Sequence, residues 1–273
     1  RSLKTREDLF DIYIQPLQWG ATSWISVNDE ERRWIDHTIE KTIVYLQQGG
    51  KLDMSLQVTI PNEWEKIAPV NIGATAGIET NKVAPLWLQK GNEAVDKIIT
   101  ISKHSAETYK NTNAYAENVE TGEKFDYNLQ TQIDYVSYPV KHFNDLPDLT
   151  IDTQTDFNFL TVAQFGPRKN ILNTVKWFVE EFLNENVGLV VKTNMAKNCL
   201  MDREIVINNL KNIVNHFPDR KCKVYLLHGD MTDEEMHSLY QHKNINALLA
   251  LPHGEGFGLP IFEATYSGLP VVA

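Results

Sequence analysis

One stretch near the end of the 273-residue chain restricts its possible folds more than any other. Residues 245–251 are a continuous apolar run, as in a buried strand, and residues 253–258 contain three glycines just before a helical segment. α/β proteins bind phosphate with this order of strand, glycine loop and helix, because free backbone N–H groups and the positive helix end meet at the loop. The stretch therefore predicts a ligand site at the carboxyl edge of a parallel sheet.

Two glutamates in this stretch, Glu255 and Glu263, stand eight positions apart. Glu255 lies in the glycine loop, and Glu263 lies about one turn into the helix, where its side chain tilts back toward the loop. A carboxylate there can accept hydrogen bonds from sugar hydroxyls. The pattern favours a site for a phosphorylated sugar or a nucleotide sugar. The alternative is an ordinary Rossmann-like glycine loop with both glutamates solvated.

Apolar strand segments alternate with helical segments throughout the second half. Thr232 and Glu235 form a capping box that predicts the start of one of these helices. The alternation indicates a parallel sheet with helices on both faces and a ligand beyond the carboxyl ends of the strands. The expected strands cover residues 157–165, 187–191, 223–227, 245–251 and 270–273.

The first half is less regular. A helix is expected over residues 28–46, and its spacing predicts that Ile35, Ile39, Ile43 and Leu46 face inward. The polar stretch 113–132 indicates a long loop or a hairpin. Further strands are expected at residues 55–60, 70–75, 97–102 and 133–136, with helices at 83–94 and 103–112.

Residues 141–156 are rich in Asp, Thr and Pro and place a domain boundary near residue 150. We expect an N-terminal domain over residues 1–150 and a C-terminal domain over residues 151–273. The chain does not begin with Met and ends inside an expected strand, so both domains are expected to be partial.

Composition excludes several classes of function. The net charge of -10 argues against a general nucleic-acid binder, and no apolar run has the length of a membrane span. The two cysteines imply no disulfide framework and favour a reducing compartment, so we expect a cytoplasmic protein. No GxGxxG motif follows an early strand, which disfavours an NAD-dependent dehydrogenase.

The segments 255–260, 263–264 and 267–273 together resemble the E-x7-E signature of the family 4 retaining glycosyltransferases. Residues 72–79, 83–87 and 99–102 resemble the acceptor-side domain of the same family, and residues 138–140 stand where its members cross to the donor domain. The resemblance covers most of the chain from about residue 55. It implies a truncated α/β fold of the GT-B type, with two Rossmann-like domains facing across a cleft.

The resemblance also implies roles for residues of the signature. Glu255 matches the glutamate that orients the donor sugar or steadies positive charge at its anomeric carbon, and Glu263 matches the one that contacts ribose hydroxyls. The backbone near Met231 would border the nucleotide base. Sugar and diphosphate would receive backbone N–H groups from Gly256, Phe257, Gly258 and Leu259.

Arg168 and Lys169 follow the first strand of the second half and precede a helix, where cations can neutralise a departing diphosphate. The family usually has an arginine where Gln164 stands, so here the arginine is displaced to Arg168, and Lys169 matches the family lysine. The competing interpretation is a solvated Arg-Lys pair at a helix start.

Glu79 follows an expected strand and either meets the acceptor or sits at a helix start, where the dipole favours it. No histidine falls in the context of the histidine that many family members carry near the reacting centre, which leaves proton handling open. No pair of histidines has metal-ligand spacing, and the sequence contains no Cys-x-x-Cys motif. We therefore expect no metal and no cofactor besides the donor substrate.

The resemblance therefore implies a retaining hexosyltransferase of carbohydrate biosynthesis, which we expect to be metal-independent. It would move a sugar from a nucleotide-diphosphate donor to a glycan, lipid or small-molecule acceptor. Two alternatives stay open. One is another GT-B enzyme, such as a sugar-nucleotide epimerase or a glycan phosphorylase. The other is a degenerate, non-catalytic scaffold that binds sugar nucleotides.

Overall fold

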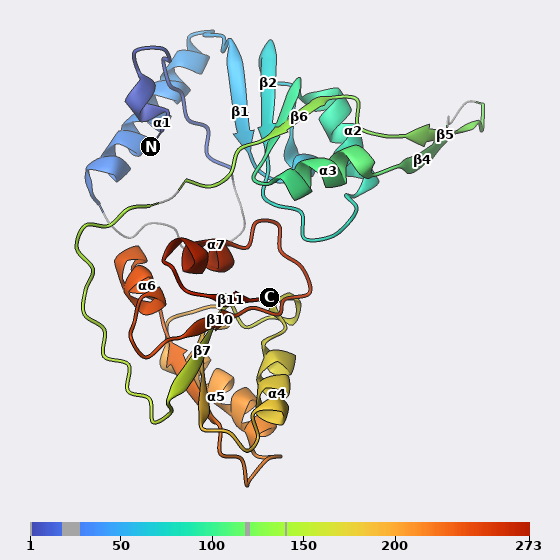
Figure 1. Ribbon diagram of the computed structural model, residues 1–273. Coiled ribbons are helices and arrows are strands. Elements are labelled where there is room, and N and C mark those ends of the chain that lie inside the picture. The colour runs from blue at the N-terminus through green and yellow to red at the C-terminus, as the bar shows by residue number, and fades with distance from the viewer. Residues whose placement is uncertain (1, 18–27, 118–120, 140) are drawn as a thin grey trace. The chain divides into compact units, whose positions relative to one another are not determined.

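The computed structural model describes residues 2–17, 28–117, 121–139 and 141–273 (Figure 1). Its contacts divide the chain into two compact units. The first comprises Arg1–Leu56 and Lys66–Asn71, and the second comprises Gln57–Glu65 and Ile72–Ala273. The expected boundary near residue 150 stays a prediction, and Val140 of the expected crossing segment lies outside the described residues.

In the first unit, a short 3-10 helix, η1 (Lys4–Arg6), precedes α1 (Glu30–Gln47), which confirms the helix expected at 28–46. The expected inward face is wrong in its second half: Ile35 and Ile39 are partly buried, but Ile43 and Leu46 are exposed while Thr38 and Thr42 are buried. Residues of the segment 11–17 contact that other face. The Ile14 amide donates to the Thr42 hydroxyl at 2.8 Å, and Tyr13 stacks on Tyr45. The buried face of α1 is therefore the one that carries Thr38 and Thr42, not the one that the apolar periodicity marks.

The first sheet has the strand order β1-β2-β3-β6, with β2, β3 and β6 paired in parallel. Ile98 and Ile133 lie opposite each other in β3 and β6 and join a core with Leu88 and Tyr109 from the adjacent helices. The bounds are β1 (Met54–Val58), η2 (Pro61–Glu63), β2 (Val70–Ala74), α2 (Pro85–Ala94), β3 (Lys97–Thr100), α3 (Lys103–Asn111) and β6 (Gln132–Tyr135).

A two-stranded antiparallel hairpin, β4 (Ala114–Glu117) and β5 (Lys124–Tyr127), projects beyond α2 and α3 (Figure 1). It occupies the stretch expected to be a long loop or hairpin, of which residues 118–120 are outside the described part. Among the described helices, none is both long and apolar enough to cross a bilayer.

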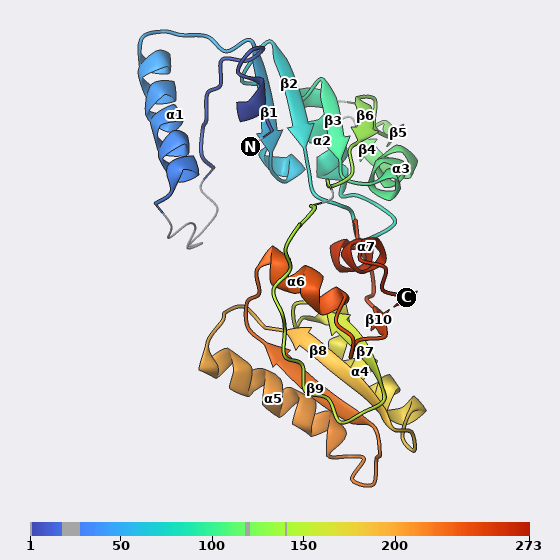
Figure 2. The ribbon, with the colours of Figure 1, turned by 60° about the vertical axis from the view of Figure 1, so that its left-hand side comes forward.

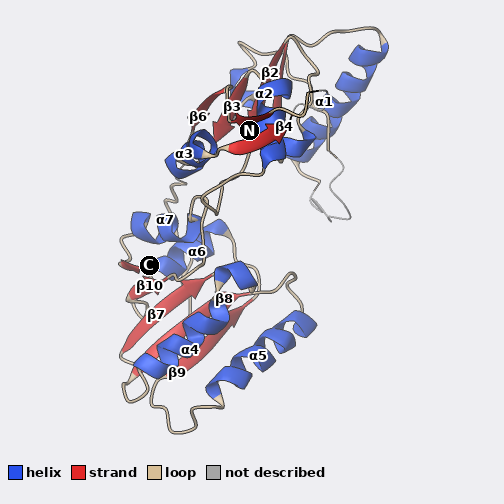
Figure 3. Ribbon diagram, turned by 90° about the vertical axis from the view of Figure 1, so that its right-hand side faces the viewer, coloured by secondary structure: helices blue, strands red, loops and turns tan. Residues whose placement is uncertain are grey.

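The second sheet is parallel and has the order β11-β10-β7-β8-β9, which confirms the expected alternation of strands and helices. The helices α4 and α5 cover one face, and α6 and α7 cover the other (Figures 2 and 3). The bounds are β7 (Phe157–Val162), α4 (Ile171–Glu181), β8 (Val187–Thr193), α5 (Leu200–Val214), β9 (Lys223–His228), α6 (Asp233–Tyr240), β10 (Ala247–Leu249), α7 (Leu259–Tyr266) and β11 (Val271–Val272).

The pairing of β7 with β10 positions the candidate site. Ala247 and Leu248 of β10 lie beside Phe159 and Leu160 of β7, and the two strands run in the same direction. The loop that follows each strand therefore leaves the sheet at the same carboxyl edge. One loop carries Arg168 and Lys169, and the other carries the glycine-rich signature.

Candidate functional site

Lys169 and Glu255 meet at this edge as an ion pair. The Lys169 ammonium donates a hydrogen bond to Glu255 Oε1, and the two side chains keep 18% and 21% of their exposure. Lys169 ends the 3-10 helix η3 (Pro167–Lys169), which precedes α4, so the cation lies near the start of a helix. The pair is accessible from solvent but partly enclosed, where charge interactions are stronger than at an open surface.

Arg168 joins three acceptors. Its guanidinium donates to the Gly254 carbonyl at 2.9 Å and lies 3.6 Å from the Glu255 carboxylate. Its other terminal nitrogen lies 3.0 Å from a carboxylate oxygen of Glu79. Arg168 therefore bridges the signature loop and the loop after β2. Both cations have carboxylate partners, and Arg168 is exposed, so the role of the two cations toward a diphosphate stays a prediction.

Glu79 is not at a helix start, since it lies in the loop between β2 and α2. Its carboxylate pairs with Arg168, which places a residue of the acceptor-side segment next to the signature loop. The side chains of Glu79 and Arg168 are each 41% exposed, so their pair is worth at most about 1 kcal/mol. The role of Glu79 toward an acceptor stays a prediction.

Asn170 fixes the cation loop to the end of the β10 strand. It has a left-handed backbone (φ 56°), which asparagine tolerates better than most residues, and it is nearly buried. Its amide nitrogen donates to the Leu251 carbonyl at 2.9 Å, and its amide oxygen accepts from Asn173 at 2.7 Å. The sequence shows an asparagine just before the helix, but the bond that gives it this role spans 81 residues.

Glycines allow two loops of the second unit to pack backbone against backbone. A Cβ on Gly77 would lie 2.6 Å from the Gly256 backbone, and a Cβ on Gly254 would lie 2.1 Å from the Glu79 carbonyl oxygen. The Ser102 hydroxyl, which also caps α3, donates to the Gly256 carbonyl at 2.7 Å. The signature glycines thus serve the loop's own packing, a role that the sequence pattern did not indicate.

Glu263 has different surroundings from Glu255. It lies on α7, is half-buried, and accepts a hydrogen bond of 3.1 Å from the Tyr240 hydroxyl. Burial raises the pKa of the Glu263 carboxyl above its usual value. Glu263 lines a cavity of about 220 Å³ together with Leu259, Phe262, His237, Met236 and others. Glu255 therefore lies in a charged environment, whereas Glu263 lies in a partly apolar one.

Phe257, Gly258 and Met231 are further residues predicted to contact the donor. Phe257 packs edge-on against Tyr138, with ring centroids 5.0 Å apart. Gly258 has a left-handed backbone (φ 75°) and caps α7. Met231 packs against the core between the sheet and α6 and α7, whereas Met236 is the methionine that lines the cavity beside Glu263. The contact of Met231 with a base stays a prediction.

Asp202 and Lys192, two further residues at the carboxyl edge, were not predicted from the sequence. Asp202 accepts hydrogen bonds from His228 at 2.8 Å and from the amides of residues 195–197, and these bonds hold its pKa well below the usual range. The buried Lys192 donates to the Gly229 carbonyl, and burial lowers the pKa of its ammonium. Asp202 ties the loop after β8 to the end of β9, and Lys192 ties β8 to the loop after β9, so both shape the carboxyl edge of the sheet.

Across the described ranges, no group of three or more His, Cys, Asp or Glu side chains is arranged to hold a metal ion. Metal independence and the lack of a cofactor stay predictions. The chemistry that the described residues offer is anion binding by Lys169 and Arg168 and hydroxyl binding by Glu255 and Glu263.

No protein-family model matches the chain. The serotype-specific mannosyltransferase WbdA of Escherichia coli is 28% identical over 198 residues, which cover 69% of this chain and 22% of WbdA. The chain thus spans about a fifth of the length of the curated relatives it matches. Among solved structures, apo OtsA matches with a TM-score of 0.54 at 9% identity, over 88% of this chain and 62% of OtsA. TarM matches with a TM-score of 0.50 at 16% identity, over 85% and 43%. The chain has the GT-B fold.

Proposed function

We propose that this chain is the partial catalytic module of a retaining, metal-independent glycosyltransferase that uses a nucleotide-diphosphate sugar. One observation carries the proposal: Lys169 and Glu255, from loops after neighbouring strands, pair at the carboxyl edge of the second sheet. Transfer from such a donor needs a cation at the departing diphosphate and an anion near the anomeric carbon, and this pair supplies both.

In the proposed reaction, Lys169 and the start of α4 bind the diphosphate and stabilise the charge that develops as the anomeric C–O bond breaks. Glu255 steadies positive charge at the anomeric carbon, and Glu263 accepts hydrogen bonds from the ribose. The acceptor hydroxyl forms the new C–O bond, and a leaving phosphate oxygen takes its proton. Bound diphosphate would compete with Glu255 for Lys169, because both are anions.

The likeness to WbdA extends the proposal to the transferred sugar, for which we infer mannose. Of the predicted acceptor classes, we propose a glycan. The two free cysteines, Cys199 and Cys222, fit a cytoplasmic reaction, since reducing compartments keep thiols unpaired.

Calorimetry and thermal shift with UDP-, GDP- and ADP-linked sugars test this function, with mannosyl donors in the panel and no added metal. Binding of one donor must raise the stability of the folded protein. Lys169→Met should lose that shift. Lys176→Met is the matched control, because Lys176 lies on α4 as an exposed lysine paired with Glu180. A folded protein that no donor stabilises, or equal binding by Lys169→Met, would contradict the proposal.

A second candidate, a scaffold that binds donor without turnover, has its own observation. Gln164 stands where the resemblance places an arginine, and its amide donates to the Met195 carbonyl at 2.6 Å instead of offering a positive charge. Donor binding with no transferred sugar after prolonged incubation with mannosides, in a protein that contains the whole chain, would favour this candidate.

A further inference from the structure

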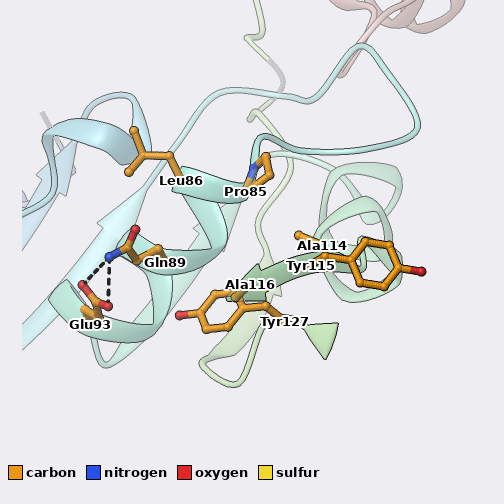
Figure 4. A pocket seen from close by; sticks show the side chains of 8 residues that line it. All are labelled: Pro85, Leu86, Gln89, Glu93, Ala114, Tyr115, Ala116 and Tyr127. Atoms are coloured by element: carbon orange, nitrogen blue, oxygen red, sulfur yellow. Dashed lines mark hydrogen bonds between the residues drawn. The ribbon is translucent and has the colours of Figure 1, made fainter. Parts of the chain in front are cut away.

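A second cavity, of about 360 Å³, lies between helix α2 and the hairpin β4–β5 (Figure 4). Its volume is at the lower end of the range for small-molecule sites, about 300–1,000 Å³. None of the residues of the candidate site lines it. The lining residues on α2 are Pro85, Leu86, Gln89 and Glu93, and those on the hairpin are Ala114, Tyr115, Ala116 and Tyr127.

The hairpin register explains why this cavity exists. Ala114 pairs with Tyr127 and Ala116 pairs with Phe125, so two small and two aromatic side chains share one face of the hairpin. The alanines leave a hollow beside the Tyr127 ring, whereas Phe125 does not line the cavity. The rings of Phe125 and Tyr127 lie edge to face, with centroids 6.4 Å apart, and Phe125 keeps 46% of its exposure.

Polar groups of α2 form the opposite wall. The Gln89 amide donates to both carboxylate oxygens of Glu93, at 3.1 and 3.2 Å, which fixes the carboxylate and leaves it lone pairs for further donors. Within the described residues, the Tyr127 hydroxyl has no hydrogen-bond partner. Figure 4 shows the Tyr127 ring on the side of Gln89 and Glu93, whereas the Tyr115 ring points away from them.

Hydrogen bonds join the α2 wall of the cavity to the chain that follows the hairpin wall. The Asn92 amide donates to the Asn128 carbonyl at 3.0 Å and accepts from the Gln130 amide at 2.7 Å. The Thr131 hydroxyl donates to the Gly91 carbonyl at 2.7 Å. The chain leaving β5 is therefore tied to the end of α2, and a ligand would enter a preformed site, which lowers the entropic cost of binding.

We propose that this cavity is an oligosaccharide-binding subsite, for two or three neutral hexose units. The C–H face of a hexose can pack on the Tyr127 ring, while its hydroxyls donate to Glu93 and accept from the Gln89 amide or the Tyr127 hydroxyl. The lining contains no lysine or arginine, so a phosphate or a nucleotide would meet only the negative charge of Glu93. Mannose as the particular hexose rests on the proposed function, whereas the preference for neutral hexoses rests on the residues that line the cavity.

Titration calorimetry of the whole chain with mannotriose and with maltotriose tests the subsite. We expect one of these trisaccharides to bind, and we expect Tyr127→Ala to raise its Kd by about tenfold or more. Ala116→Phe fills the hollow without removing a polar group and should raise the Kd by a similar factor. Tyr135→Ala is the matched control, because Tyr135 is an exposed tyrosine on β6 outside the lining.

The nucleotide-sugar titration, run on the same samples, separates this proposal from the function proposed above. Trisaccharide binding that both cavity variants lose and Tyr135→Ala keeps would support the subsite, even if no donor binds. The subsite is overturned if a folded protein binds neither trisaccharide, or if both cavity variants bind as the unaltered chain does, even when donor binding is intact.

Discussion

Lys169 donates a hydrogen bond to Glu255, although 86 residues separate them in the chain. The parallel pairing of β7 with β10 brings them together, because both loops leave the sheet at its carboxyl edge. Each charge neutralises the other while the site is free. A diphosphate that binds there must therefore replace or share the carboxylate partner of the lysine.

The two members of this pair should affect nucleotide binding in opposite directions. Glu255→Gln removes the competing anion, so we expect the Kd for the matching nucleoside diphosphate to fall by about tenfold, whereas Lys169→Met should raise it by a similar factor. Both changes should lower transfer at least about 100-fold, because each removes a charge that stabilises the transition state. Calorimetry at low salt measures the affinities. If both variants changed the Kd in the same direction, Glu255 and the diphosphate would not compete directly for Lys169.

Gly77 should tolerate no side chain. Its Cβ would lie 2.6 Å from the Gly256 backbone, so Gly77→Ala must push the signature loop away, and we expect a large loss of donor binding or transfer. Gly166→Ala is the matched control, because a Cβ there meets nothing within 4 Å and the backbone is extended. If both variants retain the donor affinity of the unaltered chain, the close packing of these loops does not matter for the site.

Asp202 should make stability depend on acid pH. Its carboxyl pKa is lower in the folded than in the unfolded protein, so the ionised group adds stability that is present above about pH 4 and is lost as the pH falls through the folded value. Asp202→Asn should lower the free energy of unfolding at pH 7, and the difference should shrink below about pH 4. Urea titrations at several pH values measure this, with the exposed Asp219→Asn as control. A difference that does not change with pH would contradict it.

Two buried tyrosines should respond oppositely to loss of the hydroxyl. The Tyr109 hydroxyl is buried and has no hydrogen-bond partner in the described part of the chain, and burial raises its pKa. Tyr109→Phe should therefore increase the free energy of unfolding by about 1 kcal/mol. The Tyr240 hydroxyl donates to Glu263, so Tyr240→Phe should decrease it by about 1 kcal/mol. Denaturant unfolding compares the two, and destabilisation by Tyr109→Phe would show that its hydroxyl does have a partner.

Local patterns in the sequence determined much of the second half. The capping box at Thr232 and Glu235 forms as expected, and the alternating strands and helices build the parallel sheet with both faces covered. The sequence also located Lys169 and Glu255 at strand ends. These features depend on residues that are near in the chain, so a pattern of a few turns or strands contains the information that specifies them.

Tertiary structure alone decided which groups meet. The pairings of Lys169 with Glu255, Arg168 with Glu79 and Asp202 with His228 depend on strand order and loop path, and no local spacing encodes them. The buried face of α1 shows the same limit, since Thr42 is buried and accepts a hydrogen bond from the Ile14 amide, while Ile43, which the apolar periodicity favours, is exposed. Periodicity reports where a side chain points on its own element, whereas the partner it finds there is set by the packing of the whole chain.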